Sequence, residues 1–248
     1  MKMKKKKWVV LVGVIAVAIG GWFYQEVKEN EVTEAQEELK SNQQLVGKDG
    51  DLTLAVERLE DASGYLKMNI KENDFTQLEA QLAAVKSEND QLIAKYKLKS
   101  NAVRHVERLE ERLSLLRQRF EFQEEINQLF IDGTAINQGV FNQKLVLKKD
   151  LTQLDIEKLE KSFEQTFEYQ EDSWITMMEQ SLEAILGQVI IIDNASRMIA
   201  DSNVEDAKNL VILLNNLTAT ETKIALLSQM TGELQEAVFE ELQLSNRL

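Results

Sequence analysis

The chain of 248 residues contains no cysteine and no proline. Without cysteine it has no disulfide, no thiolate metal ligand and no cysteine nucleophile. Proline breaks helix interiors because it lacks an N–H and clashes with the preceding turn, so its absence is typical of long helices. The abundant residues Glu, Gln, Lys and Leu favour helix by intrinsic propensity. We therefore predict an all-α fold that is stabilised by helix packing rather than by disulfides.

Residues that carry metal or catalytic chemistry are also scarce. His105 is the one histidine, whereas a protein zinc site needs several nitrogen or sulfur ligands. The acidic segment that starts at Asp49 matches part of a calcium loop, but Leu54 stands where the sharp turn requires glycine. No GxSxG, HExxH or phosphate-binding glycine loop is present. We therefore predict a protein that is not an enzyme and that binds no cofactor or metal.

The N-terminus contains a basic cluster followed by an uncharged apolar run over residues 8–24. At about 1.5 Å per residue, a helix of this length approaches the roughly 30 Å hydrocarbon core of a bilayer. Aromatic rings at both ends suit the two membrane–water interfaces, and the lysines keep the N-terminus cytoplasmic by the positive-inside rule. We therefore predict a cytoplasmic basic tail (1–7) and a transmembrane anchor (8–24). The residues assigned to the anchor are Lys4, Lys5, Lys6, Lys7, Trp8, Trp22 and Tyr24.

A cleaved signal peptide is the alternative to this anchor, since Ala16-Val17-Ala18 matches a small-x-small cleavage site. That site lies inside the apolar run, with Ile19 and the second group of aromatic residues still to follow. We therefore favour an uncleaved single-pass anchor in the cell membrane, with every residue after Tyr24 outside the cytoplasm.

The charge of the chain limits its partners. The formal net charge is −13 although the N-terminal tail is basic, so the chain beyond the anchor is strongly acidic. Such a surface repels nucleic acid and anionic lipid. The expected partners are the membrane that holds the anchor, envelope proteins, and peptidoglycan or another wall polymer, and nucleic acid is not expected.

Turn signals divide the chain beyond the anchor into four parts. The predicted parts are a helical stalk (25–50), a long helical hairpin or coiled coil (51–131), a loop (132–151) and a C-terminal helical bundle (152–248). The loop is the longest predicted non-helical stretch, and such loops are often functional. Together these parts predict an elongated antiparallel bundle.

Apolar residues in steps of three and four form a coiled-coil seam in the helical hairpin. The seam consists of Phe75, Leu78, Leu82, Val85, Asn89, Leu92 and Tyr96, and it resumes at Leu109, Leu113, Leu116 and Phe120. Asn89 stands at an a position, where a buried Asn fixes register and oligomeric state. A homodimer through this seam is one interpretation, and an intramolecular antiparallel bundle is the one that we favour.

Capping residues mark several helix starts. Thr152 with Asp155 forms a capping box, and Ser173 is the predicted cap of the following helix. The helix starts near Phe75, Thr152 and Val204 resemble one another. This similarity predicts a weak internal repeat of helix, turn and returning helix.

A local basic run lies in the second half of the helical hairpin, with glutamates three or four residues away. Salt bridges along the helix are the favoured role of these arginines. The alternative is a docking patch for an anionic wall polymer, and its candidate residues are Arg112, Arg117 and Arg119.

A resemblance to a known family is carried by FEFQEEINQLF at Phe120–Phe130, LKKDLTQLDIEKL at Leu147–Leu159 and NVEDAKNLVILLNNLTATETKIALLSQM at Asn203–Met230. These stretches resemble the helical extracellular regions of Gram-positive single-pass envelope proteins, of the type of the mid-cell anchoring division protein of streptococci. The resemblance implies an extracellular helical module that contacts cell wall or an envelope partner. That family carries a large cytoplasmic segment, whereas only residues 1–7 are expected in the cytoplasm here. The division role and the family's functional residues are therefore not carried over.

Architecture rather than a catalytic motif supports the functional prediction. We expect a membrane-anchored scaffold or adaptor of the bacterial cell envelope that acts through helical protein–protein contacts. Two alternatives stay open: a helical-bundle sensor or ligand-binding ectodomain, and a component of a secretion or conjugation complex.

Overall fold

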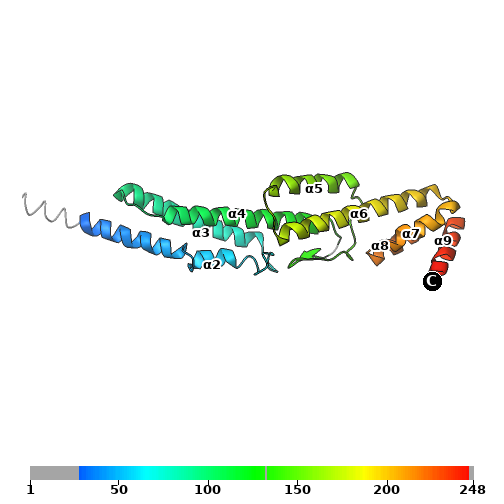
Figure 1. The fold of residues 1–248 in the computed structure, drawn as a ribbon, viewed down its shortest axis with the longest axis horizontal. Coiled ribbons are helices and arrows are strands. Elements are labelled where there is room, and N and C mark those ends of the chain that lie inside the picture. The colour runs from blue at the N-terminus through cyan, green and yellow to red at the C-terminus, as the bar shows by residue number, and fades with distance from the viewer. Residues whose placement is uncertain (1–27, 132, 246–248) are drawn as a thin grey trace, which may run out of the picture. The chain divides into compact units, whose positions relative to one another are not determined.

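The computed structural model describes residues 28–131 and 133–245 (Figure 1). These residues are mostly helical, and their strands form one two-stranded sheet, so the predicted all-α class is confirmed in outline. The chain divides into two compact units: unit 1 contains residues 28–58 and Lys71–Leu115, and unit 2 contains Leu59–Ile70 and residues 116–245. The predicted basic tail and transmembrane anchor lie outside the described residues.

Unit 1 is a helical bundle. It contains a helix over residues 28–45, α2 (Asp51–Glu57), α3 (Glu72–Tyr96) and the first half of α4 (Ala102–Asn127). On α3 the predicted seam is buried from Phe75 to Asn89, and Leu82 is fully buried within it. Towards the end of α3, Leu92 and Tyr96 are only half-buried. The seam therefore supplies the core of unit 1 over most of its predicted length.

Between α2 and α3 the chain forms a narrow hairpin rather than the expected helix. The apolar spacing over residues 52–70 predicts one helix, but α2 ends early and Glu60 forms an isolated antiparallel bridge with Leu66. The Asp61 carboxylate accepts hydrogen bonds from the backbone N–H groups two and four residues further on, at 2.8 and 3.1 Å. Such an Asx turn competes with the helix for the backbone, which explains why the helical expectation is wrong here.

The same arrangement recurs after α4. Phe130 forms an isolated antiparallel bridge with Leu147. Asn142 Oδ1 accepts a hydrogen bond from the N–H two residues further on (3.1 Å), as the Asp61 carboxylate does in the first hairpin. The two hairpins are therefore copies of one unit, in which a helix leads through a bridged turn into the next helix.

A capped helix follows each hairpin. The N–H of Lys71 donates to the Asp74 carboxylate (2.8 Å) before α3, and the N–H of Thr152 donates to the Asp155 carboxylate (3.1 Å) before the next helix. The third predicted copy differs, because the chain there begins with the short 3-10 helix η1 (Val204–Asp206) and no bridge precedes it within the described residues. Across residues 28–131 and 133–245, the internal repeat therefore has two copies.

The second copy contains an inserted β-hairpin within the segment predicted as a loop. Its strands β1 (Ile136–Asn137) and β2 (Val140–Phe141) are antiparallel. Gln138 and Gly139 connect them with φ angles of 48° and 75°, the left-handed pair that a tight hairpin turn requires. A Cβ added to Gly139 would lie 2.7 Å from ring carbons of Tyr65. Tyr65 of the first hairpin therefore packs directly on this turn.

Further helices complete the described part of unit 2. They are α5 (Gln153–Phe167), α6 (Ser173–Asp201), α7 (Ala207–Asn215), α8 (Thr220–Leu227) and α9 (Gly232–Ser245). α5 lies beside α6 (Figure 1), and the rings of Phe122, Phe163, Phe167 and Trp174 form an aromatic cluster with centroids 5.0–6.0 Å apart. The C-terminal half of α6 packs with α7 and α9 around a second, aliphatic cluster.

The caps of α5 and α6 bear out one prediction and correct another. Thr152 is the N-cap of α5, and its side chain accepts a hydrogen bond from the N–H of Asp155 (3.3 Å), as predicted. Ser173 is the first residue of α6 rather than its cap. The cap is Asp172, because its carboxylate accepts from the N–H groups of Trp174 (3.0 Å) and Ile175 (3.1 Å).

α6 is, within the described residues, the helix that is long and apolar enough to cross a membrane by length and composition. It lies in the middle of the chain. Its longest stretch without a charged residue runs only from 184 to 192, between Glu183 and Asp193, whereas a bilayer core requires roughly 20 residues. Trp174, Met178 and Ile185 on this helix are no more than 1% exposed. The apolar side of α6 is therefore used by the core of unit 2.

Candidate functional site

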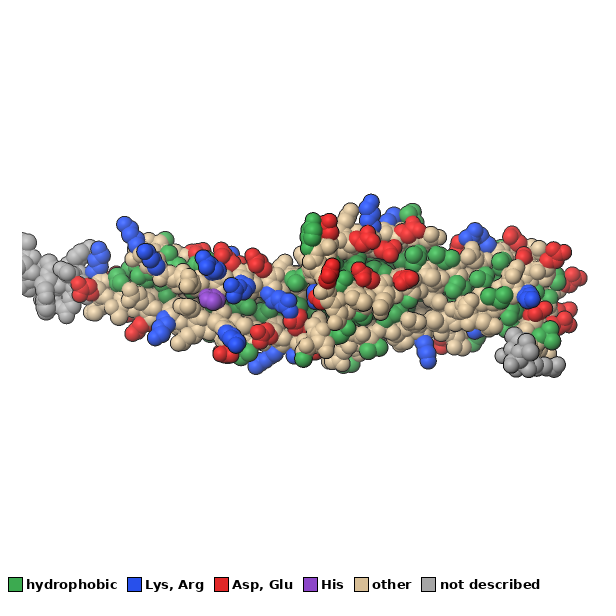
Figure 2. Space-filling model, in the orientation of Figure 1, with side chains coloured by type: hydrophobic (Ala, Val, Ile, Leu, Met, Phe, Trp, Pro, Cys, Tyr) green, Lys and Arg blue, Asp and Glu red, His purple; other side chains and the backbone are tan. Residues whose placement is uncertain are grey.

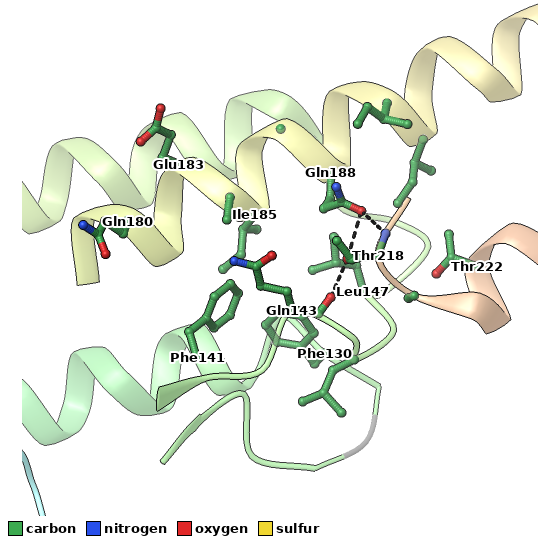
Figure 3. Close-up of a pocket in the computed structure, with 16 residues that line it drawn as sticks. Phe130, Phe141, Gln143, Leu147, Gln180, Glu183, Ile185, Gln188, Thr218 and Thr222 are labelled. Carbon is green, nitrogen blue, oxygen red and sulfur yellow. Dashed lines mark hydrogen bonds between the residues drawn. The ribbon is translucent and has the colours of Figure 1, made fainter. Parts of the chain in front are cut away.

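A pocket of about 400 Å³ opens on unit 2, where three segments of the chain meet (Figure 3). α6 forms the first wall, the inserted hairpin and the chain after it form the second, and the turn into α8 forms the third. The volume lies in the range of ligand pockets in proteins. We therefore take this pocket as the candidate functional site.

The walls of the pocket are largely apolar. Ile185 of α6 is 1% exposed, and the half-buried Ile191 and Ile192 continue the same wall along the helix. Across the pocket, the rings of Phe130 and Phe141 pack edge to face with their centroids 6.1 Å apart (Figure 3). An apolar part of a ligand would therefore be covered from two sides.

Gly187 makes room in the pocket near the middle of α6. A Cβ added there would meet no atom within 4 Å, and Gly187 is not among the glycines with positive φ. A glycine inside a helix costs about 1 kcal/mol relative to alanine. Neither the backbone nor a close neighbour requires glycine at this position, so its structural effect is the open space in the pocket.

A polar network joins the three walls. The N–H of Thr218 donates to Gln188 Oε1 (2.9 Å), and the Thr218 hydroxyl donates to the backbone carbonyl of Gln143 (Figure 3). Gln188 Nε2 also donates to the carbonyl of Asn216 (3.1 Å). These bonds link α6, the chain after the inserted hairpin and the turn before α8. Hydrogen bonds within the folded chain therefore stabilise the arrangement of the three walls around the pocket.

The polar groups of the pocket lining can form hydrogen bonds with a ligand. They are the amides of Gln143, Gln180 and Gln188, the hydroxyls of Thr218 and Thr222, and the carboxylate of Glu183. Amides can donate and accept hydrogen bonds. Glu183 is the one ionisable side chain in the lining, and it has there no second acid, base or activated nucleophile with which to act. The pocket therefore suits a neutral or cationic ligand.

The segment predicted as a loop contributes one wall of this pocket, but the sequence does not predict the pocket. The loop prediction singles out residues 132–151, and Phe141, Gln143 and Leu147 from this segment line the pocket. Gly187 is the other sequence feature that could have indicated the pocket, because a glycine inside a predicted helix lowers the stability of that helix and therefore calls for an explanation. The sequence does not show that these two features face each other.

The three arginines of the candidate wall-polymer patch all lie on α4 but differ in exposure. Arg112 is exposed on unit 1. Arg117 is in unit 2, where its Nε pairs with Glu121 Oε1 one turn further along α4 (3.0 Å). Arg119 is only 3% exposed. Its assignment to a surface patch is therefore wrong, because a polymer cannot reach a side chain that the fold encloses.

Arg119 belongs instead to the core of unit 2. Its guanidinium forms an ion pair with Asp172 and lies 5.0 Å from the centre of the Trp174 ring. Burial opposes ionisation of Asp172, but the Arg119 guanidinium and the N–H groups at the start of α6 outweigh it and hold the pKa of Asp172 below its ordinary value. The seam prediction misplaces Phe120, because the buried stripe of α4 steps by three residues from Leu116 to Arg119.

Asn89, the candidate register residue of an oligomer, is bonded within its own chain. Its side chain is fully buried and accepts a hydrogen bond from Asn42 Nδ2 (3.0 Å), which also donates to Glu88 Oε2 (2.9 Å). Asn42 lies on the helix over residues 28–45. Asn89 therefore joins that helix to α3 within one chain, as the favoured intramolecular bundle requires, and its role in an oligomer stays a prediction.

Glu88, which accepts a hydrogen bond from Asn42, also forms a pH-dependent contact with Glu38. Their mutual hydrogen bond raises the pKa of Glu38 and lowers the pKa of Glu88 from the ordinary value of 4.5. Glu38 stabilises the fold at pH values below 4.5, and this contribution is lost as the pH rises through the raised pKa of Glu38. Glu88 behaves in the opposite way, because its contribution is lost as the pH falls through the lowered pKa of Glu88. Once the pH has risen above the raised pKa of Glu38, both groups are ionised and their contact is repulsive.

We therefore expect the Glu38→Gln variant to melt at a higher temperature than the unmodified protein at pH 7. The glutamine amide donates to Glu88 at every pH, so the gain should shrink near pH 4, where Glu38 itself carries the proton. Glu37→Gln is the matched control, because it removes the same charge from the neighbouring exposed position. The same gain in both variants, measured by thermal melting at the two pH values, would contradict the assigned contact.

The residues that could bind a metal are dispersed. His105, purple in Figure 2, is half-buried on α4 in unit 1. Across the residues that the structure describes, no group of three or more His, Cys, Asp or Glu side chains is arranged to hold a metal ion. The expectation that the protein binds no metal stays a prediction.

No family model, no curated protein and no solved structure matches the chain. The resemblance to extracellular helical regions of Gram-positive envelope proteins therefore stays a prediction. The pocket and its lining are the features on which a function can be proposed.

Proposed function

We propose that the protein is a membrane-anchored adaptor of the bacterial cell envelope, which binds an envelope partner outside the cytoplasm through the pocket of unit 2. It catalyses no reaction. One observation carries this proposal: the pocket is preformed, and its lining combines apolar walls, amides and a single carboxylate. Such a set of groups can recognise a ligand but lacks the paired groups that acid–base or nucleophilic catalysis needs.

The proposed topology follows from the charges that flank the apolar runs. The lysine cluster before residues 8–24 favours a cytoplasmic N-terminus and an external remainder. α6 then stays on the outer side as a core helix, because its charge-free stretch is short and its largest apolar side chains are buried in unit 2. In this arrangement all the helices of unit 2 lie on the same side of the membrane.

A ligand-binding ectodomain is the second candidate, and the pocket's volume favours it, since about 400 Å³ also suits a small molecule. The two candidates differ in what occupies the pocket in the cell. An adaptor holds part of another envelope protein there, whereas a sensor holds a free small molecule that raises its melting temperature.

Photo-crosslinking in intact cells tests the adaptor function. A benzoyl-phenylalanine at Gln180, an exposed pocket residue, should form a discrete crosslink to an envelope protein. The same group at Lys158 on the exposed side of α5 is the control and should not form it. Adding Gly187→Leu should abolish the crosslink, because the new side chain fills the pocket. A product that is absent at Gln180, or that survives Gly187→Leu, would contradict the proposal.

A further inference from the structure

We propose that the pocket of unit 2 takes a short extended peptide segment that presents an apolar side chain and, beside it, a cationic side chain. This inference rests on the proposed adaptor function and gives the chemistry of the partner segment that enters the pocket. Four features of the pocket support it: its volume, its unengaged amides, its single carboxylate and the space at Gly187.

The volume favours an extended segment over a helix. A single turn of helix is about 5 Å long and 10–12 Å wide with its side chains, so it already fills a pocket of about 400 Å³. An extended segment occupies less width and therefore fits the volume of this pocket, which α6 and the inserted hairpin line. A partner helix would have to stay outside.

The amides favour a peptide backbone. Gln143 and Gln180 are exposed at the pocket, and their side-chain amides form no hydrogen bond with other described residues. Each peptide group offers one donor and one acceptor, and a glutamine amide offers both in return. Gln188 is engaged with Thr218 and Asn216, so it shapes the site while the other two amides can pair with an incoming backbone.

The charge of the lining selects a cation. Glu183 is exposed and is the one ionisable group in the lining, which contains no Lys, Arg or His. Acidic side chains also occur on the face of unit 2 that Figure 2 shows, in a chain whose formal net charge is −13. This field attracts a lysine or arginine of a partner and disfavours phosphate-rich or other anionic wall polymers.

The apolar side chain of the segment belongs at Gly187. The gap left by the missing side chain lies in the same wall as Ile185 and Ile191. On a helix, residues four apart share a face, so Glu183 stands one turn before Gly187. An apolar residue that enters this gap would place a neighbouring cationic residue close to the Glu183 carboxylate.

Selection from a random hexapeptide phage library on the full-length protein, with counter-selection on the Gly187→Leu variant, tests this chemistry. We expect the recovered peptides to carry Lys or Arg next to an apolar residue. Replacing that lysine by norleucine should weaken binding of a fluorescein-labelled recovered peptide about threefold in the unmodified protein, as for an exposed ion pair. The same replacement should have no effect in the Glu183→Gln variant.

Melting temperatures provide the folding control. Gly187→Ala and Gly187→Leu should melt at or above the temperature of the unmodified protein, because both residues favour helix over glycine. Recovery of no peptide, recovery of acidic or uncharged peptides, or equal binding to Gly187→Leu would overturn the inference. If crosslinking at Gln180 still captures an envelope protein in these cases, the adaptor function stands and the peptide chemistry fails. If peptides bind as expected but no protein is crosslinked in cells, the adaptor function fails instead.

Discussion

Replacing Asp172 by alanine should destabilise unit 2 by about 3 kcal/mol at pH 7. The substitution leaves the guanidinium of Arg119 buried without its ion-pair partner, and it removes the N-cap of α6 at the same time. Breaking a fully buried pair costs about 3–5 kcal/mol, and the value is placed at the lower end because the Asp172 side chain is 43% exposed. Denaturant unfolding followed by circular dichroism would measure the loss.

Two further variants separate the ion pair from a general charge effect. Asp193→Ala breaks a pair with Arg197 on the same helix, but both side chains are more than 60% exposed, so its cost should stay below about 0.5 kcal/mol. Arg119→Met should cost less than Asp172→Ala, since an apolar side chain fills the site and Asp172 still caps α6. Equal costs for Asp172→Ala and Asp193→Ala would contradict the assignment of Arg119 to the core.

The effect of Asp172→Ala should also depend on pH. Because the folded protein holds the pKa of Asp172 below its ordinary value of 3.8, this carboxylate stabilises the fold above that value and the contribution is lost as the pH falls through the lowered pKa. The difference in unfolding free energy between the variant and the unmodified protein should therefore narrow in acid, where both lack the charge.

Replacing Gly139 by alanine should destabilise the protein by about 2–3 kcal/mol. Gly139 has a φ of 75°, which strains any other L residue, and its added Cβ would lie 2.7 Å from ring carbons of Tyr65. The Tyr65 hydroxyl also donates to the carbonyl of Ser173 (3.3 Å), so the ring cannot move away without losing that bond. The expected result combines backbone strain with a displaced contact between the two hairpins.

Gly64 provides the matched control for this substitution. It has a φ of 83°, but a Cβ added there would meet nothing within 4 Å. Gly64→Ala should therefore cost only the backbone strain, about 1 kcal/mol. If chemical denaturation shows the same loss for Gly64→Ala and Gly139→Ala, the packing of Tyr65 on the inserted hairpin is not as described.

The sequence predicts the parts of this fold that depend on regular apolar spacing or on contacts between residues close together in the chain. The seam from Phe75 to Asn89 and the cap at Thr152 are confirmed because each depends on residues a few positions apart. The hairpin at Leu59–Ile70 is missed for the opposite reason. The spacing of its apolar residues also fits a helix. The Asx turn at Asp61 favours the hairpin, because the Asp61 side chain bonds backbone groups that a helix would use, and the apolar spacing does not show this competition.

For Arg119 and Asn89 the sequence predicts the helix that carries each residue but not the group that its side chain contacts. Both residues lie on predicted helices, but the sequence does not say what each one faces. Arg119 faces the start of α6, and Asn89 faces Asn42 on the first described helix. The pocket is unpredictable for the same reason, because Phe130, Gln188 and Thr218 approach one another only in the folded chain.

Labelling of single cysteines tests directly whether unit 2 lies outside the cytoplasm. Because the chain contains no cysteine, Lys158→Cys and Lys208→Cys each create one thiol, at exposed positions before and after α6. A membrane-impermeant maleimide should label both variants in intact cells. Labelling of only one would mean that α6 crosses the membrane, and labelling of neither until the cells are permeabilised would place unit 2 in the cytoplasm. Either result would contradict an envelope adaptor that meets its partner outside the cell membrane.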